Sequence, residues 1–144
     1  FINAVGGLGS PWWRQDIESA FVDADLNNEG SLMVAVIESI IFMLRANIDL
    51  MIKESPLKNL RVSGGLSRLD GLCQKLSNLC ALPVERVNNP EATARGVAWL
   101  AAGRPDDWMN ASSMKSFTPV IDESLNARYV RYMQVLNQKL ELSA

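Results

Sequence analysis

The sequence predicts an α/β layer structure. Short, β-prone segments alternate along the chain with longer segments whose apolar residues recur at helical spacing. The clearest unit is a short predicted strand, residues 60–63, which runs into Gly64 and Gly65 and then into a helical pattern. With 144 residues, of which 48% are hydrophobic, the chain is long and apolar enough to bury a sizeable core.

The N-terminal residues predict two short strands. Residues 1–5 are apolar and β-prone, and the glycine-rich segment 6–11 predicts a tight loop after them. Residues 17–22 predict the second strand, and the polar residues 23–30 predict a connection. Because the chain begins with Phe1, inside an apolar segment, we expect it to be a piece of a longer polypeptide.

Residues 31–54 predict a long, mostly buried helix. Ser31 can cap its first turn, and Pro56 ends it. Its charged side chains share one narrow stripe at helical spacing, formed by Glu38, Arg45, Asp49 and Lys53. Glu38 and Ser39 interrupt the longest apolar run, which therefore falls short of the roughly 18 uninterrupted apolar residues of a membrane span. We expect no membrane partner.

The middle of the chain repeats the order strand, turn, helix. Residues 60–63 predict a strand that ends at the glycine pair, and Ser67 can cap the helix that follows. The apolar face of this helix contains Leu69, Leu72, Cys73, Leu76, Leu79 and Cys80. Residues 84–87 predict another strand.

Two further helices are predicted toward the C-terminus. Asn89, Pro90 and Glu91 can begin the first, with a capping side chain, a first-turn proline and an acid at the positive end of the helix dipole. This helix stops near Gly103. Its small side chains, which predict close packing against another backbone, are Ala94, Gly96, Ala98, Ala101 and Ala102. After a polar connector, Asp122 can cap the last helix.

We expect these elements to form one domain in two parts. Residues 1–103 are the predicted α/β core, and residues 104–144 are a connector and a helix that packs on the same domain.

Composition excludes several classes of function. A net charge of −2 gives no electrostatic reason to bind nucleic acid, so none is expected as a partner. The chain has no histidine, which excludes histidine acid–base chemistry, catalytic triads and histidine metal sites. Cys73 and Cys80 would lie about 10 Å apart on a helix, too far for a disulfide. They indicate buried thiols in a reduced, cytoplasmic protein.

Residues 61–67 are the strongest local candidate for a ligand site. Glycines after a strand let a ligand approach the backbone, and the start of the next helix presents N–H groups to an anion. The segment lacks the Lys and Ser/Thr of a P-loop, and it does not fit the GxGxxG fingerprint. From these residues alone, a nucleotide site and an ordinary strand-to-helix turn both stay open.

Four segments read in order resemble the C-terminal domain of the FGGY carbohydrate kinases, with glycerol kinases as the most similar branch. These segments are FINAVGGLGSPWW, VAVIESIIF, LRVSGGLSRLDGLCQKLSNL and PVERVNNPEATARGVAWLAAG. The pattern E-x-T-A-x-G-x-A is met by Glu91, Thr93, Ala94, Gly96 and Ala98. The resemblance covers nearly the whole chain.

The resemblance implies a ribonuclease H-like fold of the actin and hexokinase type, with a mixed sheet and flanking helices. It also implies ATP and Mg²⁺ as cofactors, with the nucleotide bound largely by this domain. Gly65 matches a family ATP contact, and Gly64 supports it. Leu69 stands where the glycerol kinase pattern has a nucleotide-binding asparagine, and Asp70 replaces another asparagine. An altered adenosine pocket is therefore expected.

The resemblance further implies that parts of the kinase lie outside these residues. The catalytic aspartate and the turns that grip the triphosphate belong upstream of Phe1, so no catalytic residue is assigned here. The expected partners are the N-terminal kinase domain of the same chain and a sugar or polyol substrate, and a homo-oligomer is left open. The alternative function is a non-catalytic regulatory or dimerisation module with the same architecture.

Other side chains have simpler interpretations than catalysis. The aspartates that could be taken for a catalytic base are read as loop or capping acids, and these are Asp16, Asp23, Asp25 and Asp70. Glu38 is expected to make a structural hydrogen bond, and Glu91 to cap a helix. The pair Trp12 and Trp13 is expected to pack at least one ring in the core.

Overall fold

The computed structural model describes residues 1–87, 91–106 and 114–142. Contacts within the chain divide it into two compact units. The first unit is formed by Phe1–Pro56 together with Asp122–Ala144, and the second is Leu57–Ile121. Both ends of the chain therefore belong to the same unit, whereas residues 104–121 of the predicted connector belong to the other.

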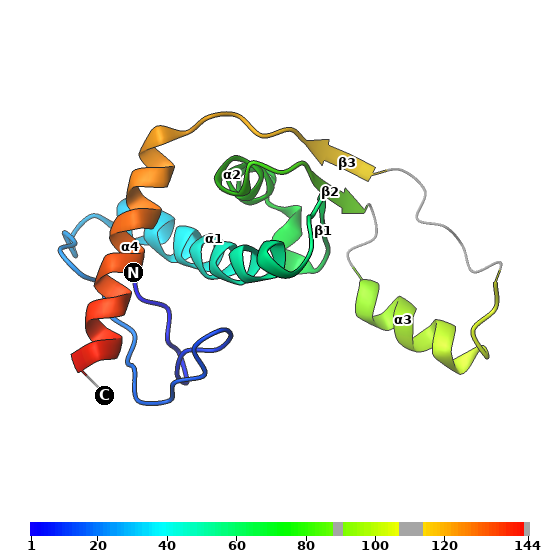
Figure 1. Ribbon diagram of the computed structural model, residues 1–144, viewed down its shortest axis with the longest axis horizontal. Coiled ribbons are helices and arrows are strands. Elements are labelled where there is room, and N and C mark those ends of the chain that lie inside the picture. The colour runs from blue at the N-terminus through cyan, green and yellow to red at the C-terminus, as the bar shows by residue number, and fades with distance from the viewer. Residues whose placement is uncertain (88–90, 107–113, 143–144) are drawn as a thin grey trace. The chain divides into compact units, whose positions relative to one another are not determined.

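The first unit is built on two long helices, α1 (Glu29–Glu54) and α4 (Glu123–Leu142), which cross each other (Figure 1). Aromatic rings join them, because Phe42 of α1 lies with its ring centroid 5.6 Å from that of Tyr129 and 5.2 Å from that of Tyr132. Leu125 and Leu136 of α4 are fully buried. Part of the core of this unit therefore lies between the two helices.

The starts of both helices are fixed by side-chain caps. Asn28, and not Ser31, caps α1, since its side-chain oxygen accepts the Ser31 backbone N–H at 3.0 Å. The predicted cap of the last helix is confirmed, because Asp122 Oδ1 accepts the Leu125 N–H at 3.0 Å. The prediction at Ser31 was wrong because the residue three positions earlier also carries a short polar side chain.

The N-terminal strands predicted over residues 1–5 and 17–22 do not form. Only isolated bridges join Ile2 to Ala20 and Leu8 to Arg14 within the described residues of this segment. The backbone N–H of Ala4 donates to the hydroxyl of Ser19, at 3.0 Å, so a side chain takes the place of a ladder carbonyl. The apolar pattern of these segments nevertheless predicts correctly which residues are buried, since Ile2, Ala4 and Ile17 all are.

Helix α1 has the length and composition of a membrane span, with a mean hydropathy of 1.7 in its most apolar window. A core helix meets the same criterion. In this structure its buried face contains Glu38, and both carboxylate oxygens of that residue bind Arg128 of α4. An ion pair between two packed helices supports the role of α1 as a core helix of this unit.

The second unit contains a three-stranded mixed sheet in the order β1-β2-β3. Its strands are β1 (Leu60–Val62), β2 (Val84–Val87) and β3 (Met114–Phe117). Strand β1 runs parallel to β2, and β2 runs antiparallel to β3, with Val84 paired to Phe117. Helix α2 (Asp70–Cys80) contacts β2 and β3. Cys73 and Cys80 of α2 are buried thiols, as predicted.

Strand β3 was not predicted, because it lies in a serine-rich stretch with no apolar alternation. Three of its four residues are exposed, and only Phe117 is buried. It forms by pairing with β2, and the hydroxyl of Ser77 on α2 donates to the carbonyl of Phe117 at 2.9 Å. Tertiary pairing, and not local propensity, decides this strand.

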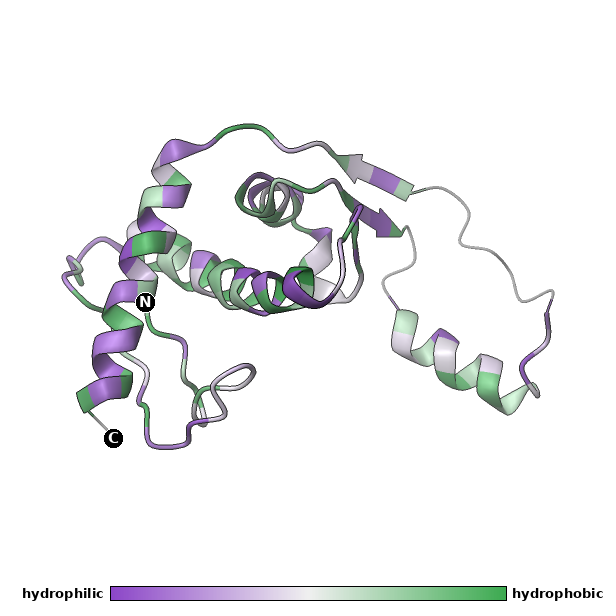
Figure 2. Cartoon of the chain, viewed as in Figure 1, coloured by the Kyte–Doolittle hydropathy of each residue, from purple (hydrophilic) through white to green (hydrophobic). Residues whose placement is uncertain are grey.

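None of the described residues of helix α3 (Ala92–Ala101) is buried, because Arg95 and Trp99 are half-buried and the other eight residues are exposed. The close packing predicted from its small side chains is therefore wrong for this chain. Val97 and Leu100 are 62% and 52% exposed, and Figure 2 shows that apolar colours dominate this helix. Glu91 occupies the capping position, but its side chain makes no capping hydrogen bond. Asn89 and Pro90 lie outside the described residues.

Candidate functional site

The glycine pair lies where β1 ends and the chain turns toward α2. Gly64 has φ +93° and ψ 173°, a backbone conformation that is essentially restricted to glycine. Gly65 has an ordinary φ, and a Cβ placed on it or on Gly64 would meet no atom within 4 Å. Gly64 is therefore required by the turn itself, whereas Gly65 leaves open space from which a ligand can approach the backbone.

A short 3₁₀ helix, η1 (Gly65–Arg68), follows the turn, and it corrects the prediction that Ser67 caps the next helix. Ser67 is buried, and its backbone N–H and hydroxyl both donate to the carbonyl of Gly64, at 3.2 and 2.7 Å. Leu69 then occupies the capping position of α2 without a side-chain bond. The extra turn arises because the hydroxyl binds backwards to Gly64 and not forwards to α2.

Basic side chains from the neighbouring strands hold this turn in place. Arg86 of β2 donates from Nη1 to the carbonyl of Ser67 and to Asp70 Oδ1, both at 2.8 Å. Lys115 of β3 binds Asp70 Oδ2 at 2.6 Å. Lys115, and next Arg86, hold the pKa of Asp70 below its usual value. Asp70 is therefore an ionised anchor of the turn, and its contacts give it a structural role.

Leu69 adds an apolar surface to the same turn. Its side chain is 46% exposed and that of Leu66 is 49% exposed, three positions apart. Neither side chain can donate or accept a hydrogen bond. A ligand placed over Gly65 would therefore meet apolar surface beside the turn.

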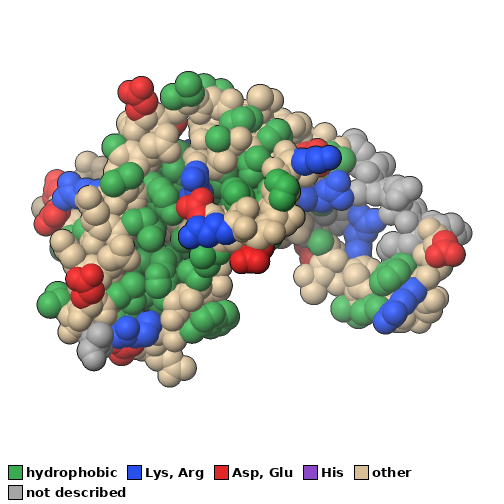
Figure 3. Space-filling view, in the orientation of Figure 1, with side chains coloured by type: hydrophobic (Ala, Val, Ile, Leu, Met, Phe, Trp, Pro, Cys, Tyr) green, Lys and Arg blue, Asp and Glu red, His purple; other side chains and the backbone are tan. Residues whose placement is uncertain are grey.

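An open hollow of about 660 Å³ begins at Ser63, the residue before the glycine pair. Side chains from β1, β2, α3 and the segment after α3 line it, including Arg61, Val87, Arg95, Trp99 and Asp106. Figure 3 shows Lys and Arg side chains gathered over the strands and beside α3. The charged residues that line the hollow are Arg61, which lies 3.5 Å from Glu85, together with Arg95 and Asp106, so the hollow offers an anionic ligand two guanidinium groups beside one carboxylate.

Two of these lining residues, Arg95 and Trp99, were not singled out from the sequence. They lie four positions apart on α3, so they share one face of the helix. The Trp99 indole N–H donates to the carbonyl of Pro105 at 3.2 Å, and the Arg104 guanidinium lies 5.9 Å from the centre of its ring. The sequence signal that could have found them is their four-residue spacing within a helix that is rich in small residues.

The other three candidate aspartates also have side-chain partners in the structure, two of them within two residues in the sequence and one on α4. Asp16 binds Arg14, which lowers the pKa of its carboxyl, and Asp23 binds Arg131 at 2.7 Å. Asp25 accepts hydrogen bonds from the backbone and side chain of Asn27. These contacts agree with the interpretation as loop acids.

The predictions for Glu38 and for the tryptophan pair have different outcomes. Glu38 is 3% exposed and accepts two hydrogen bonds from Arg128, at 2.7 and 2.8 Å, so the predicted structural role is confirmed. The prediction for the tryptophans was wrong, because Trp12 is only partly buried and Trp13 is 75% exposed. Trp13 has a positive φ of 52°, within a turn that directs its ring to the surface.

Metal ligation by protein side chains alone has no support in the described residues. Among them, no group of three or more His, Cys, Asp or Glu side chains could hold a metal ion. Burial raises the pKa of the Cys73 thiol, which therefore stays protonated and unreactive at neutral pH.

Comparison with known proteins identifies the family. The model of the FGGY family of carbohydrate kinases, C-terminal domain, matches residues 1–103, well over half of the chain. The chain belongs to the FGGY family of carbohydrate kinases. The four sequence segments that suggested this resemblance lie within the matched range.

Curated relatives of this FGGY domain include glycerol kinases. The glycerol kinase of Trichodesmium erythraeum is 34% identical over an alignment of 146 residues, gaps included, and the alignment covers 96% of this chain and 29% of that protein. The glycerol kinase of Limosilactobacillus reuteri is 30% identical over 125 residues, which cover 85% of this chain and 25% of that protein. This chain thus spans less than a third of the length of these relatives.

Solved structures share the fold of this FGGY domain. A Plasmodium falciparum glycerol kinase with ADP matches 99% of this chain and 30% of that chain, with a TM-score of 0.73 and 22% identity. A xylulose kinase from Lactobacillus acidophilus matches 92% of this chain and 29% of that chain, with a TM-score of 0.68 and 22% identity. The predicted ribonuclease H-like fold of the actin and hexokinase type, with a mixed sheet and flanking helices, is confirmed.

Proposed function

We propose that this chain is the nucleotide-binding C-terminal part of an ATP-dependent carbohydrate or polyol kinase similar to glycerol kinase. The observation that carries the proposal is the open approach to Gly65, on a turn that Gly64 and Ser67 hold rigid. Backbone N–H groups at the start of a helix suit a phosphate oxygen, and the basic side chains around them favour an anion. Because the chain belongs to a family of kinases, we infer that this anion is a nucleotide.

ATP would lie with its adenosine and α-phosphate side against Gly64 and Gly65. It supplies the γ-phosphoryl group of the reaction, and Mg²⁺ neutralises the charge of its phosphates. Mg²⁺ would be bound through the phosphates of the nucleotide and through the N-terminal domain that grips them. The part of this chain is to bind and orient the nucleotide.

Leu69 changes the character of the adenosine side of the site. Its exposed side chain offers the flat face of a purine an apolar contact in place of an amide hydrogen bond. Ionised Asp70 is held by Lys115 and Arg86 and stays part of the turn. We therefore expect weaker discrimination of the base than an asparagine at position 69 would give.

The remainder of the parent protein would supply the chemistry on the acceptor. A catalytic aspartate that removes a proton from the sugar or polyol hydroxyl is placed in the N-terminal domain of the same chain, together with most contacts to the substrate. We expect the parent enzyme to work in the cytoplasm, where ATP and reduced cysteines coexist. The 144-residue chain alone is expected to be inactive as a kinase.

The test is a titration of the chain with Mg-ATP, and separately with Mg-ADP, followed by NMR of the backbone amides. Localised and saturable shifts are expected at Gly64, Gly65 and Ser67. The variant Gly65→Ala should weaken them, and Gly30→Ala in α1, where the added Cβ makes only ordinary contact, serves as a matched control. Absence of a localised response up to millimolar nucleotide would count against the proposal.

A further inference from the structure

Strand β3 lies beyond the residues that the family model matches, yet it contributes a charged side chain to the anchoring of the glycine turn. The match ends at residue 103, whereas β3 begins at Met114 and pairs with β2. In this pairing Lys115 lies directly opposite Arg86. Residues opposite each other in an antiparallel pair share one face of the sheet, so β3 places a second cation beside that of β2.

Both cations bind the same carboxylate. Lys115 Nζ lies 2.6 Å from Asp70 Oδ2, and Arg86 Nη1 lies 2.8 Å from Asp70 Oδ1. Asp70 is the first residue of α2, so the ion-pair cluster of Asp70, Arg86 and Lys115 ties the start of that helix to two strands. The ring of Phe117 supports the cluster, because its centre lies 5.5 Å from the Arg86 guanidinium and 5.4 Å from Lys115 Nζ.

Arg86 extends the ion-pair cluster to the backbone of the turn. Its Nη1 also donates to the carbonyl of Ser67 at 2.8 Å, and its side chain is only 18% exposed. The backbone N–H and the hydroxyl of Ser67 both donate to the carbonyl of Gly64. A continuous series of hydrogen bonds and ion pairs therefore joins Lys115 on β3 to the glycine pair.

The place of β3 against α2 is fixed by further hydrogen bonds. The hydroxyl of Ser77 on α2 donates to the carbonyl of Phe117 at 2.9 Å. The side chain of Gln74, also on α2, donates to the carbonyl of Thr118 at 2.8 Å. Because β3 cannot leave the sheet without breaking these bonds, Lys115 reaches Asp70 from a fixed position.

We propose that Arg86 and Lys115 are positioning residues for the nucleotide, which fix the glycine turn through their partners and do not touch the ligand. This role rests on the proposed function, because it concerns the same turn. Backbone N–H groups bind a phosphate oxygen more tightly when their direction is fixed before the ligand arrives. A turn that is correctly formed for only part of the time lowers the apparent affinity by that fraction.

A direct electrostatic effect on the nucleotide would have the opposite sign at Asp70. Lys115, and next Arg86, lower the pKa of the Asp70 carboxyl, which is therefore ionised at neutral pH. Removal of a negative charge beside an anion site should by itself strengthen the binding of ATP. If Asp70 instead holds the turn, Asp70→Ala should weaken binding although it removes a negative charge.

The experiment measures the Kd of Mg-ATP for the 144-residue chain and its variants by NMR titration. Arg86→Met and Asp70→Ala should each raise the Kd by about three- to tenfold, as expected when the turn is correctly formed for about 10–30% of the time. Lys115→Met should raise the Kd by about threefold at most, because its ion pair with Asp70 is half exposed. Lys115→Arg, which keeps the ion pair, should bind as the wild type does.

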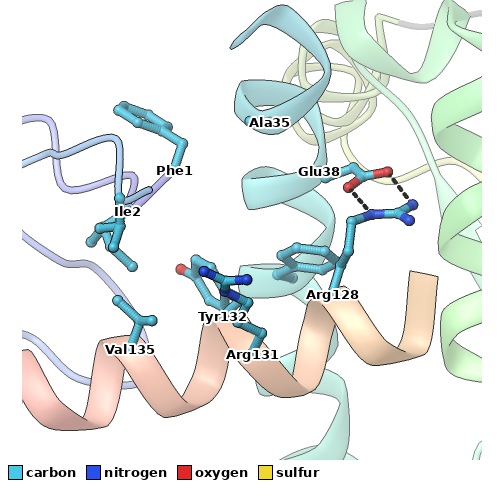
Figure 4. A pocket seen from close by; sticks show the side chains of 10 residues that line it. Phe1, Ile2, Ala35, Glu38, Arg128, Arg131, Tyr132 and Val135 are labelled. Carbon is cyan, nitrogen blue, oxygen red and sulfur yellow. Dashed lines mark hydrogen bonds and ion pairs between the residues drawn. The ribbon is translucent and has the colours of Figure 1, made fainter. Parts of the chain in front are cut away.

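Two control variants lose the same charges elsewhere. Arg131→Met removes an arginine of α4 in the first unit (Figure 4), where it forms an exposed ion pair with Asp23. Lys58→Met removes an exposed lysine that precedes β1, at the opposite end of that strand from the glycine pair. Both control variants should bind Mg-ATP with the Kd of the wild type.

Two further readouts separate positioning from an effect of charge. In the Asp70→Ala chain, the additional change Lys115→Met should alter the Kd no more than Lys58→Met does, because Lys115 acts through Asp70. In the chain without nucleotide, the Ser67 N–H that donates to Gly64 should exchange with solvent about three- to tenfold faster in Arg86→Met than in the wild type.

Results that overturn this role differ from those that overturn the proposed function. If the wild-type chain binds no nucleotide, the proposed function fails and the positioning role fails with it. If the wild type binds Mg-ATP and Asp70→Ala binds it equally or more tightly, the proposed function stands and the positioning role fails. Unchanged exchange of the Ser67 N–H in Arg86→Met would also overturn it, because the ion-pair cluster would then not hold the turn.

Discussion

Gly64 and Gly65 are neighbours, yet the structure predicts opposite effects for the same substitution. At Gly64, φ +93° and ψ 173° place any other residue in a region that costs about 1–3 kcal/mol. No atom lies within 4 Å of the added Cβ, so the cost of Gly64→Ala is that of the backbone alone. For a chain of this size, that corresponds to a fall of roughly 4–12 °C in Tm.

Gly65→Ala should leave stability unchanged or raise it by about 0.4–1 kcal/mol, because its φ is ordinary and its surroundings are open. The methyl group would nevertheless occupy the space from which a nucleotide approaches the turn. The assay is thermal unfolding of both variants, with and without Mg-ATP, alongside the wild-type chain. Ligand-induced stabilisation should be lost in Gly65→Ala.

A different pattern of results would refute this reasoning. If Gly65→Ala keeps the full stabilisation by Mg-ATP, the nucleotide does not approach the backbone at Gly65. If Gly64→Ala unfolds at the same temperature as the wild type, the turn does not require its positive φ.

Three further predictions concern side chains around the two units. Leu69→Asn should raise the stability of the chain by about 1 kcal/mol, measured as Tm, because it supplies the missing cap of α2, whereas Leu69→Ala should not. Arg128→Met should cost about 3 kcal/mol in urea unfolding, since it removes the partner of buried Glu38, and Arg131→Met, whose ion pair is exposed, should cost less than about 1 kcal/mol. The pKa of Asp70 is lowered in the folded chain, so the ionised carboxylate stabilises the fold above its usual pKa near 3.8, and this stabilisation is lost as the pH falls below that value. The variant Asp70→Asn lacks this titrating group, and its Tm should therefore fall less steeply than that of the wild type between pH 5 and 2.

Helical periodicity was the most reliable signal in the sequence. The long helix, the cysteine-bearing helix and the last helix all form, because each has an apolar face that packs within its own unit. The strands at residues 60–62 and 84–87 form for a related reason. They are short segments in which valine and leucine flank charged residues, a helical crossover joins them, and parallel pairing follows from that connection.

The wrong predictions about strands share a different cause. Residues 1–22 contain β-prone segments, but Gly6 and Gly7 adopt positive φ and the Ser19 hydroxyl replaces a ladder partner. In strand β3 a polar segment that was not predicted to be a strand becomes one, because it pairs with the edge of β2. Both outcomes depend on contacts that are distant in the sequence, which local propensity does not contain.

Helix α3 gives the clearest case in which a sequence pattern points beyond this chain. Small residues on a helix face allow close approach of another backbone, yet a Cβ added to Gly96 would meet no atom within 4 Å, and Val97 is 62% exposed. The chain spans less than a third of the length of its curated relatives. The pattern is therefore consistent with a contact made by the remainder of the parent protein.

The departures at positions 69 and 70 affect the candidate site differently. Asp70 keeps the turn fixed through its ion pairs with Arg86 and Lys115 on the sheet. The bonds from Ser67 to Gly64 do not involve either position. The shape of the glycine turn is thus independent of Leu69, and only the surface beside it has become apolar. A loss of nucleotide affinity caused by Leu69 would therefore be reversed by the single change Leu69→Asn, whereas a loss caused by a deformed turn would not.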